Sequence, residues 1–317
     1  MSRVLVTGGA GFIGSHLVDN LLINNDVVVL DNLSSGTLDN IRHHLNQSNF
    51  EFQKGSITSQ EDVKRALNDI DLVYHFAAQP DVRYGTSNPL EDFRVNMIGG
   101  MAILEEMRIR DIDRMVFASS GGTVYGDSEV FPTPENTILR PVSNYGAAKC
   151  AFEMYLSSYS ELYGINSVSL RLANIIGPRL THGVIYDFYM KLKKDPTRLE
   201  VLGTGRQEKA YQYVTDTVRA IVTLVNKLGE GYLPVNVSSG ERLTVARIAE
   251  IVCDGLGVPD AVIEYTGSER GWAGDVVATD LDISLLKKFG WNSLINLEEG
   301  VKLYLQWIVG IYGAVKY

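Results

Sequence analysis

Short apolar segments alternate with longer amphipathic stretches over the first half of the chain. The apolar segments are almost continuously hydrophobic, which is typical of parallel strands buried on both faces of a sheet. A repeated strand–helix–strand order implies right-handed crossovers, so the pattern predicts an α/β fold with a doubly wound parallel sheet. The predicted strands are residues 3–7, 27–31, 50–55, 72–76, 115–119 and 168–172, and the predicted helices are residues 12–24, 60–69, 90–110 and 143–163.

The pattern becomes looser after Pro178, which predicts a smaller, mixed α/β lobe at the carboxy-terminal end. The chain is expected to return to the first sheet near residues 212–240. We therefore predict a larger domain of residues 1–175 plus roughly 212–240, and a smaller lobe of residues 176–211 and 241–317. The short strands expected here are residues 199–202, 211–214, 233–238 and 262–265, and the helices are residues 184–194, 215–228, 244–256, 283–289 and 297–309.

Composition narrows the class of protein. The chain has 317 residues, of which 45% are hydrophobic, and its net charge of −9 argues against a nucleic-acid or membrane-surface role. No apolar run approaches the ~20 residues of a membrane span. Cys150 and Cys253 form no paired motif, and the chain opens directly into a strand, so we expect a cytoplasmic protein without a cleaved leader. The five histidines lack paired-ligand spacing, and no metal site is predicted.

A glycine-rich turn follows the first strand, with the spacing Gly8-x-x-Gly11-x-x-Gly14. Such glycines permit a tight turn and close approach to a pyrophosphate, and the following helix offers free N–H groups to the anion. Asp31 ends the second strand, where a carboxylate accepts hydrogen bonds from a ribose and repels a 2′-phosphate. This context predicts a Rossmann domain that binds NAD rather than NADP; the alternative for Asp31 is a cap or turn residue.

Tyr145 and Lys149 stand four residues apart on one face of a predicted helix. A free phenol has a pKa of about 10 and is a poor base at neutral pH. A nearby ammonium and an oxidised nicotinamide both favour the phenolate, so Tyr145 could take a proton from a sugar hydroxyl. Elsewhere such a pair is usually part of a solvated face; its place after the fifth strand favours the catalytic interpretation.

The motifs resemble those of the extended short-chain dehydrogenase/reductase family, and within it the UDP-glucose 4-epimerases, particularly archaeal ones. This resemblance covers essentially the whole chain. It implies NAD-dependent interconversion of UDP-glucose and UDP-galactose by transient oxidation at C4, and a homodimer that pairs the helices near 90–110 and 143–163. The motifs are TGGAGFIG (7–14), HFAA (75–78), SSGGTVYG (119–126) and the Tyr–Lys pair, together with residues 31–36, 88–99, 171–179, 182–188 and 270–276.

The resemblance also implies which residues contact the dinucleotide. At position 56 relatives often have Asp; Ser56 can still bond the adenine amino group, without charge. The implied cofactor residues are Gly8, Gly11, Phe12, Ile13, Gly14, Asp31, Asn32, Ser35, Gly36, Ser56, Ile57, Ala77, Ala78, Gln79, Asn96, Tyr145 and Lys149.

One catalytic position departs from the family pattern. The family usually has Ser or Thr three residues before the Val of the VYG motif, to assist the tyrosine, and this chain has Gly121 there. Ser120 and Thr123 flank it; we favour Ser120, with Thr123 close behind, and the alternative is that these hydroxyls only cap strand-end backbone groups. Related 4,6-dehydratases carry Asp-Glu where this chain has Gly121-Gly122, so a dehydratase is disfavoured.

The substrate contacts rest on the resemblance alone. Lys209 replaces a common arginine and lacks its bidentate fork, and the spacing after Arg270 differs from the common Arg-Pro-Gly-Asp. Thr279 stands where some relatives have a tyrosine beside the sugar, which leaves room for N-acetylated sugars. The implied substrate residues are Arg83, Ser120, Tyr145, Asn174, Arg179, Val184, Lys209, Arg270 and Thr279.

Two other functions use the same motifs. One is another nucleotide-sugar epimerase or an oxidoreductase of the same family, which would show a different sugar preference or net consumption of NAD. The other is a non-catalytic NAD-sensing protein, which the intact Tyr–Lys pair disfavours and Gly121 keeps open.

Overall fold

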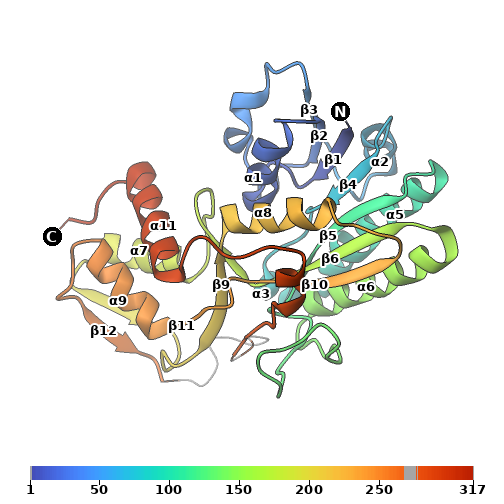
Figure 1. The fold of residues 1–317 in the computed structure, drawn as a ribbon. Coiled ribbons are helices and arrows are strands. Elements are labelled where there is room, and N and C mark those ends of the chain that lie inside the picture. The colour runs from blue at the N-terminus through green and yellow to red at the C-terminus, as the bar shows by residue number, and fades with distance from the viewer. Residues whose placement is uncertain (1, 268–275, 277, 317) are drawn as a thin grey trace.

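A seven-stranded sheet organises the computed structural model, which describes residues 2–267, 276 and 278–316 (Figure 1). Every pair of neighbouring strands is parallel, which confirms the predicted doubly wound fold. The order reverses direction between the first and fourth strands, and such a switch point opens a crevice at the carboxyl ends of the strands. In spatial order the strands are β10 (Tyr232–Val237), β6 (Asn166–Leu172), β5 (Arg114–Ser120), β4 (Leu72–His75), β1 (Arg3–Thr7), β2 (Asp26–Asp31) and β3 (Phe50–Lys54).

Helices cover both faces of this sheet, which explains why its strands are apolar throughout. On β1, Val4 and Val6 join the hydrophobic cluster on the face covered by α1 and α8. Leu5 points the opposite way, into the cluster under α2, α5 and α6. The bounds of these helices are α1 (Phe12–Leu21), α8 (Val214–Val225), α2 (Gln60–Ala66), α5 (Gly100–Ile109) and α6 (Asn144–Tyr163).

The predicted helix over 90–110 is confirmed, but it is not uniform. It consists of α4 (Pro89–Phe93), a wider π-helical segment (Arg94–Gly99) and α5, in unbroken succession. A short helix that was not predicted, α3 (Val82–Ser87), precedes it. Two single 3₁₀ turns, η1 (Leu38–Asn40) and η2 (Arg42–His44), follow β2. π segments in helices are frequent at functional sites.

The carboxy-terminal lobe lies beside the sheet (Figure 1). It packs a hydrophobic cluster of its own. The predicted return to the first sheet is confirmed by β10. The predicted strand over 211–214, however, belongs to β9 and pairs within the lobe, and the three-residue strands β7 and β11 were not predicted. The domain boundaries themselves stay a prediction. The lobe contains β7 (Asn174–Ile176), β9 (Glu208–Tyr213), β11 (Arg242–Thr244), β8 (Arg198–Val201), β12 (Val262–Tyr265), α7 (Val184–Lys194), α9 (Val245–Gly255) and α11 (Leu297–Tyr312); α10 (Ser284–Lys288) packs on β10.

Among the residues that the structure describes, no helix combines the length and the apolarity that crossing a bilayer requires.

Candidate functional site

A cleft of about 1910 Å³ runs from the carboxyl ends of the sheet strands into the carboxy-terminal lobe. The structure brings almost all the predicted site residues to this cleft, from segments far apart in sequence. Gly36 and Asn96 do not line it, and Arg270 lies outside the described residues. The predicted residues that line it are Gly8, Gly11, Phe12, Ile13, Gly14, Asp31, Asn32, Ser35, Ser56, Ile57, Ala77, Ala78, Gln79, Arg83, Ser120, Thr123, Tyr145, Lys149, Asn174, Arg179, Val184, Lys209 and Thr279.

The glycine turn at the start of α1 is shaped to receive an anion. Gly8 adopts a φ of +72°, which favours glycine, and a Cβ at Gly14 would lie only 2.2 Å from the Gly8 carbonyl oxygen. No side chain caps the amino-terminal end of α1, and its first turn has no acidic residue. Its N–H groups and positive dipole end therefore favour a phosphate there, and the turn fits the pyrophosphate of a dinucleotide.

The carboxylate of Asp31 is held at the end of β2 by the neighbouring backbone. Its Oδ2 accepts from the Ala10 N–H at 2.9 Å and its Oδ1 from the Leu33 N–H at 2.8 Å. Burial raises the pKa of this carboxyl, and the two hydrogen bonds oppose that effect. Each oxygen keeps a further lone pair, so Asp31 can accept from a ribose hydroxyl.

Gly36 and Asn96 support the cleft instead of lining it. A Cβ at Gly36 would lie 2.7 Å from the Ala10 carbonyl carbon, so this glycine lets the loop after β2 close on the phosphate turn. Asn96, in the π segment, is buried, and its side chain bonds both the N–H and the C=O of Gln79, at 2.9 and 3.1 Å. It thereby fixes the backbone that follows β4.

Tyr145 and Lys149 lie in the first turns of α6, where Ser143 caps the helix by accepting from the Gly146 N–H. The Lys149 Nζ is 5.4 Å from the centre of the Tyr145 ring and 4.7 Å from that of Phe117. Burial lowers the pKa of Lys149 to about 8. Burial and the charge of Asp92 raise the pKa of Tyr145, so the predicted phenolate needs a further positive charge, such as that of an oxidised nicotinamide.

Three hydroxyls at and just after the end of β5 line the cleft, those of Ser119, Ser120 and Thr123. The Ser119 hydroxyl already donates to Glu153 at 2.5 Å. The Thr123 Oγ1 is buried without a hydrogen-bond partner among the residues that the structure describes, so it is available to a ligand. A Cβ at Gly121 would lie 2.6 Å from Leu281 Cδ1 and 2.9 Å from the carbonyl oxygen of Arg171. A serine therefore does not fit at position 121.

The predicted substrate residues Asn174, Val184, Lys209 and Thr279 line the part of the cleft that is formed by the carboxy-terminal half of the chain. Asn174 donates to the Ala210 carbonyl at 3.1 Å, and the Thr279 hydroxyl accepts from the Ala210 N–H at 3.1 Å. Val184 begins α7 in the same part of the cleft. The Arg83 side chain remains 62% exposed beside Asp81.

Arg179 is placed differently from the other predicted cations. Its Nη2 pairs with Asp19 Oδ2 of α1 at 2.8 Å, so a diphosphate must compete with this ion pair. The other Asp19 oxygen accepts from His43 and His44. One side-chain atom from each of Asp19, His43 and His44 could bind a metal ion, and these three atoms lie within 4.8 Å of one another. The guanidinium on the same carboxylate opposes the binding of a cation there.

Comparison with known proteins identifies the family. Residues 4–238 match the NAD-dependent epimerase/dehydratase family model. The chain belongs to this family. The UDP-glucose 4-epimerase of Mycolicibacterium smegmatis is 34% identical over 94% of this chain and 96% of that protein.

Solved structures agree with this assignment. The UDP-glucose 4-epimerase of Thermotoga maritima, solved with UDP-glucose, is 35% identical with a TM-score of 0.89 over 98% of this chain and 99% of that one. The UDP-N-acetylglucosamine 4-epimerase of Methanobrevibacter ruminantium, in complex with UDP-N-acetylmuramic acid, is 30% identical with a TM-score of 0.89, again over 98% and 99%. These relatives support a nucleotide-sugar epimerase, and NAD is the cofactor of the family.

A buried polar network, which was not predicted from the sequence, lies behind the cleft of this epimerase/dehydratase chain. Glu153 is fully buried; Arg171 donates to it at 2.7 and 3.1 Å, and the Tyr232 hydroxyl donates at 2.8 Å. Arg171 also donates to Tyr125 at 2.9 Å. The sequence signal for it was Arg171, a charged residue within a strand that was predicted to be buried.

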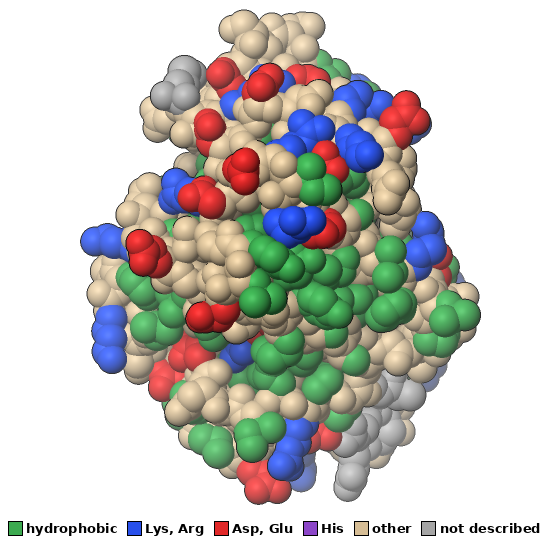
Figure 2. Space-filling view, turned by 90° about the vertical axis from the view of Figure 1, so that its right-hand side faces the viewer, with side chains coloured by type: hydrophobic (Ala, Val, Ile, Leu, Met, Phe, Trp, Pro, Cys, Tyr) green, Lys and Arg blue, Asp and Glu red, His purple; other side chains and the backbone are tan. Residues whose placement is uncertain are grey.

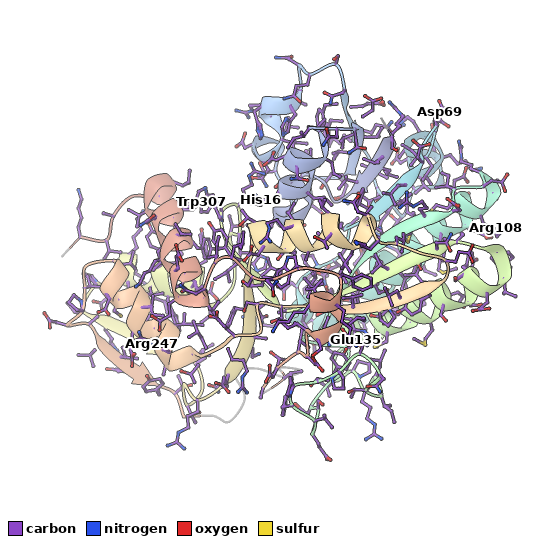
Figure 3. All side chains as sticks on the ribbon, in the orientation of Figure 1. His16, Asp69, Arg108, Glu135, Arg247 and Trp307 are labelled. Atoms are coloured by element: carbon purple, nitrogen blue, oxygen red, sulfur yellow. The ribbon has the colours of Figure 1, made fainter. Side chains whose placement is uncertain are left out.

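The network continues toward the carboxy-terminal segments. The Tyr125 hydroxyl donates to the Asn236 side chain at 2.7 Å. The Asn236 N–H donates to the Glu135 carboxylate at 3.0 Å (Glu135 is labelled in Figure 3). The Asn236 amide nitrogen also donates to the carbonyl oxygens of Thr133 and Asp282. The strands behind the cleft are thus joined to the segment that carries Leu281.

Gly14→Ala tests the phosphate turn. Because the added Cβ meets the Gly8 carbonyl, the turn must shift, and overpacking of this kind costs roughly 1–3 kcal/mol. We expect NAD binding to weaken about tenfold or more, measured as the NAD released from purified protein by acid. Gly310→Ala is the matched control, since a Cβ there meets nothing within 4 Å. Full NAD occupancy in Gly14→Ala would contradict the assignment.

Proposed function

We propose that this protein is a 4-epimerase that interconverts UDP-glucose and UDP-galactose with tightly held NAD. The observation that carries the proposal is the meeting of Tyr145 and Lys149 with the hydroxyls of Ser120 and Thr123 in one cleft, which the phosphate turn also lines. The glycine at position 122 also lines the cleft where related dehydratases use a carboxylate. The epimerase names of the relatives support the same reaction.

The chain's residues account for the binding part of this reaction. The phosphate turn would hold the pyrophosphate, Asp31 a ribose hydroxyl, and Lys149 the nicotinamide end. When bound, NAD supplies the reversible two-electron oxidation at C4. Lys209 adds a positive charge to the wall on which the substrate diphosphate would lie, where charge-assisted hydrogen bonds suit phosphate oxygens.

The proton is handled by Tyr145. Its phenolate oxygen takes the proton of the sugar 4-hydroxyl as C4 is oxidised to a ketone. Ser120 or Thr123 orients the same sugar oxygen by a hydrogen bond. After the 4-keto sugar has turned its other face, the hydrogen and two electrons given up to the cofactor would return to C4 on that face while Tyr145 returns the proton to the oxygen, so C4 would be inverted with no net change in redox state.

The first test is conversion of UDP-galactose by purified protein without added cofactor. We expect a stable mixture with UDP-glucose and no net NADH. Tyr145→Phe should lower the rate by about 10²–10⁴, the usual contribution of a positioned general base. Tyr265→Phe is the control, because this tyrosine is 45% exposed in β12, outside the cleft.

The alternatives give different results in this assay. Retention of more than a tenth of the wild-type rate by Tyr145→Phe would remove Tyr145 from the mechanism. Stoichiometric consumption of NAD would favour an oxidoreductase. Binding of NAD without turnover of any UDP-sugar would favour a sensor.

A second candidate substrate is a UDP-sugar with an N-acetyl group. Thr279 is buried at the wall of the cleft, and its hydroxyl is held by Ala210, so it projects little bulk. The Methanobrevibacter relative is named for UDP-N-acetylglucosamine. Thr279→Tyr should lower kcat/KM for this sugar by about tenfold or more while UDP-galactose is less affected, because a tyrosine fills the space beside C2. Failure of the wild-type protein to turn over millimolar UDP-N-acetylglucosamine would exclude the candidate.

The oligomer we propose is a homodimer that pairs the helical segment from α4 to α5 with α6. Figure 2 shows hydrophobic side chains gathered on the face that carries α5 and α6. Monomeric proteins rarely expose large apolar patches of this kind. The exposed apolar residues of these helices are Leu90, Phe93, Ile98, Ile109, Met154, Tyr155, Leu162 and Tyr163.

Met154→Glu tests this interface, since it places a charge within the apolar face. Light scattering after size-exclusion chromatography should give twice the chain mass for the wild type and a shift toward the monomer for the variant. Val262→Glu is the control, because Val262 is similarly exposed (59% against 53% for Met154) but lies in β12. A wild-type protein that stays monomeric at micromolar concentration would refute the dimer.

A further inference from the structure

Asp92 of α4 is a buried carboxylate outside the predicted site. Its side chain is fully buried, and its Oδ2 accepts from Gln79 Nε2 at 3.3 Å. Its Oδ1 is buried without a hydrogen-bond partner among the described residues. A buried, incompletely bonded carboxylate costs free energy unless a nearby positive charge compensates it.

The surrounding helices are built to admit this side chain. A Cβ at Gly85 of α3 would lie 2.4 Å from Asp92 Oδ2, so the glycine makes the space that the carboxylate occupies. The Gly85 carbonyl in turn accepts from Asn144, the residue before Tyr145, at 3.0 Å. Helices α3 and α4 both pack against α6. Asp92 therefore lies against the end of α6 that carries Tyr145 and Lys149.

Lys149 has four titratable groups near it: Asp92 from α4, Glu153 and Tyr145 from α6, and His75 from β4. His75 is neutral, because burial lowers its pKa to about 3, and its Nδ1 is bonded to Thr7 at 2.7 Å. Tyr145 is itself the group to be ionised. This leaves the two carboxylates as counter-ions for the buried ammonium.

The two carboxylates differ in what already neutralises them. Glu153 receives three hydrogen bonds from the Arg171 guanidinium and others from Ser119 and Tyr232. Its charge is thus balanced within its own network. The hydrogen-bonding groups that act on Asp92 are the uncharged side-chain amides of Asn96 and Gln79, and the charge that acts on it is that of Lys149.

We propose that Asp92 is a positioning residue whose buried carboxylate keeps the Lys149 ammonium charged beside Tyr145. The residue acts through Lys149 and does not touch the substrate. The inference rests on the proposed function in that Tyr145 is taken as the base.

The pH dependence of the rate distinguishes an electrostatic role of Asp92 from a packing role. The charge of Asp92 raises the pKa of Lys149 and also that of Tyr145. The acid limb of the pH–rate profile reports the ionisation of Tyr145, and the alkaline limb the loss of the Lys149 ammonium. Removing the charge lowers both pKa values, so the whole profile moves to lower pH. A packing defect would lower the rate at every pH alike.

Asp92→Asn in the NAD-containing protein is the test, because asparagine keeps the shape and removes the charge. We expect both limbs of the profile to shift to lower pH by about one unit, which is the lower end of the range of pKa shifts that a close charge causes. Glu61→Gln is the control, since it removes an exposed carboxylate from α2. Asp92→Ser removes the charge with a smaller side chain and serves if the asparagine variant does not fold.

A second measurement separates this inference from the proposed function. Tyrosinate absorbance, taken as the difference between proteins with and without Tyr145→Phe, follows the ionisation of Tyr145 without any turnover. A shift of this titration to lower pH in Asp92→Asn supports the electrostatic role even if no UDP-sugar is epimerised. An unmoved titration and an unmoved pH profile in a folded, NAD-containing variant overturn it.

Discussion

The ion pair between Glu153 and Arg171 is the constraint on which the geometry of the cleft depends. Both side chains are almost wholly removed from solvent, with exposures of 0% and 4%, so each requires a full set of partners. These partners come from β5, β6 and β10, while Glu153 itself belongs to α6. The helix cannot slide or rotate over the sheet without leaving a buried charge unpaired. Lys149 stands one turn before Glu153, so its place relative to Ser120 is set by the same bonds.

Two buried carboxylates near one buried lysine have separate tasks. Glu153 is saturated by donors and serves to join elements, whereas Asp92 keeps one oxygen unbonded and serves as a source of negative potential. Proximity alone does not distinguish these tasks. They are distinguished by the number of hydrogen bonds that each carboxylate already accepts, because a charge that is locally neutralised acts weakly on its neighbours.

The sequence predicted the features that depend on local chemistry. The apolar strands, the glycine turn, Asp31 and the Tyr145–Lys149 spacing all came from periodicity and short motifs, and the structure brings them together. The strands β7 and β11 could not be predicted, since three residues are too few for a period to be seen. Asp92 and Glu153 resembled ordinary helix-surface charges, because their burial comes from contacts with distant segments. Ser120 and Thr123 could not be distinguished for the same reason.

The packing of Gly121 against Leu281 makes the catalytic motif dependent on a residue far along the chain. Leu281 arrives beside the motif through the bridge with Thr133, so the space at position 121 is set by the carboxy-terminal segment. A carboxylate at position 121 would meet this leucine and the Arg171 carbonyl before it met a sugar. The change from the glycine pair to the acidic pair of the dehydratases therefore requires both Leu281 and the Arg171 carbonyl to move, in addition to substitution within the motif. A smaller residue at position 281 would remove the first of these two obstacles and leave the second, so the two motifs are separated by changes in two distant parts of the chain.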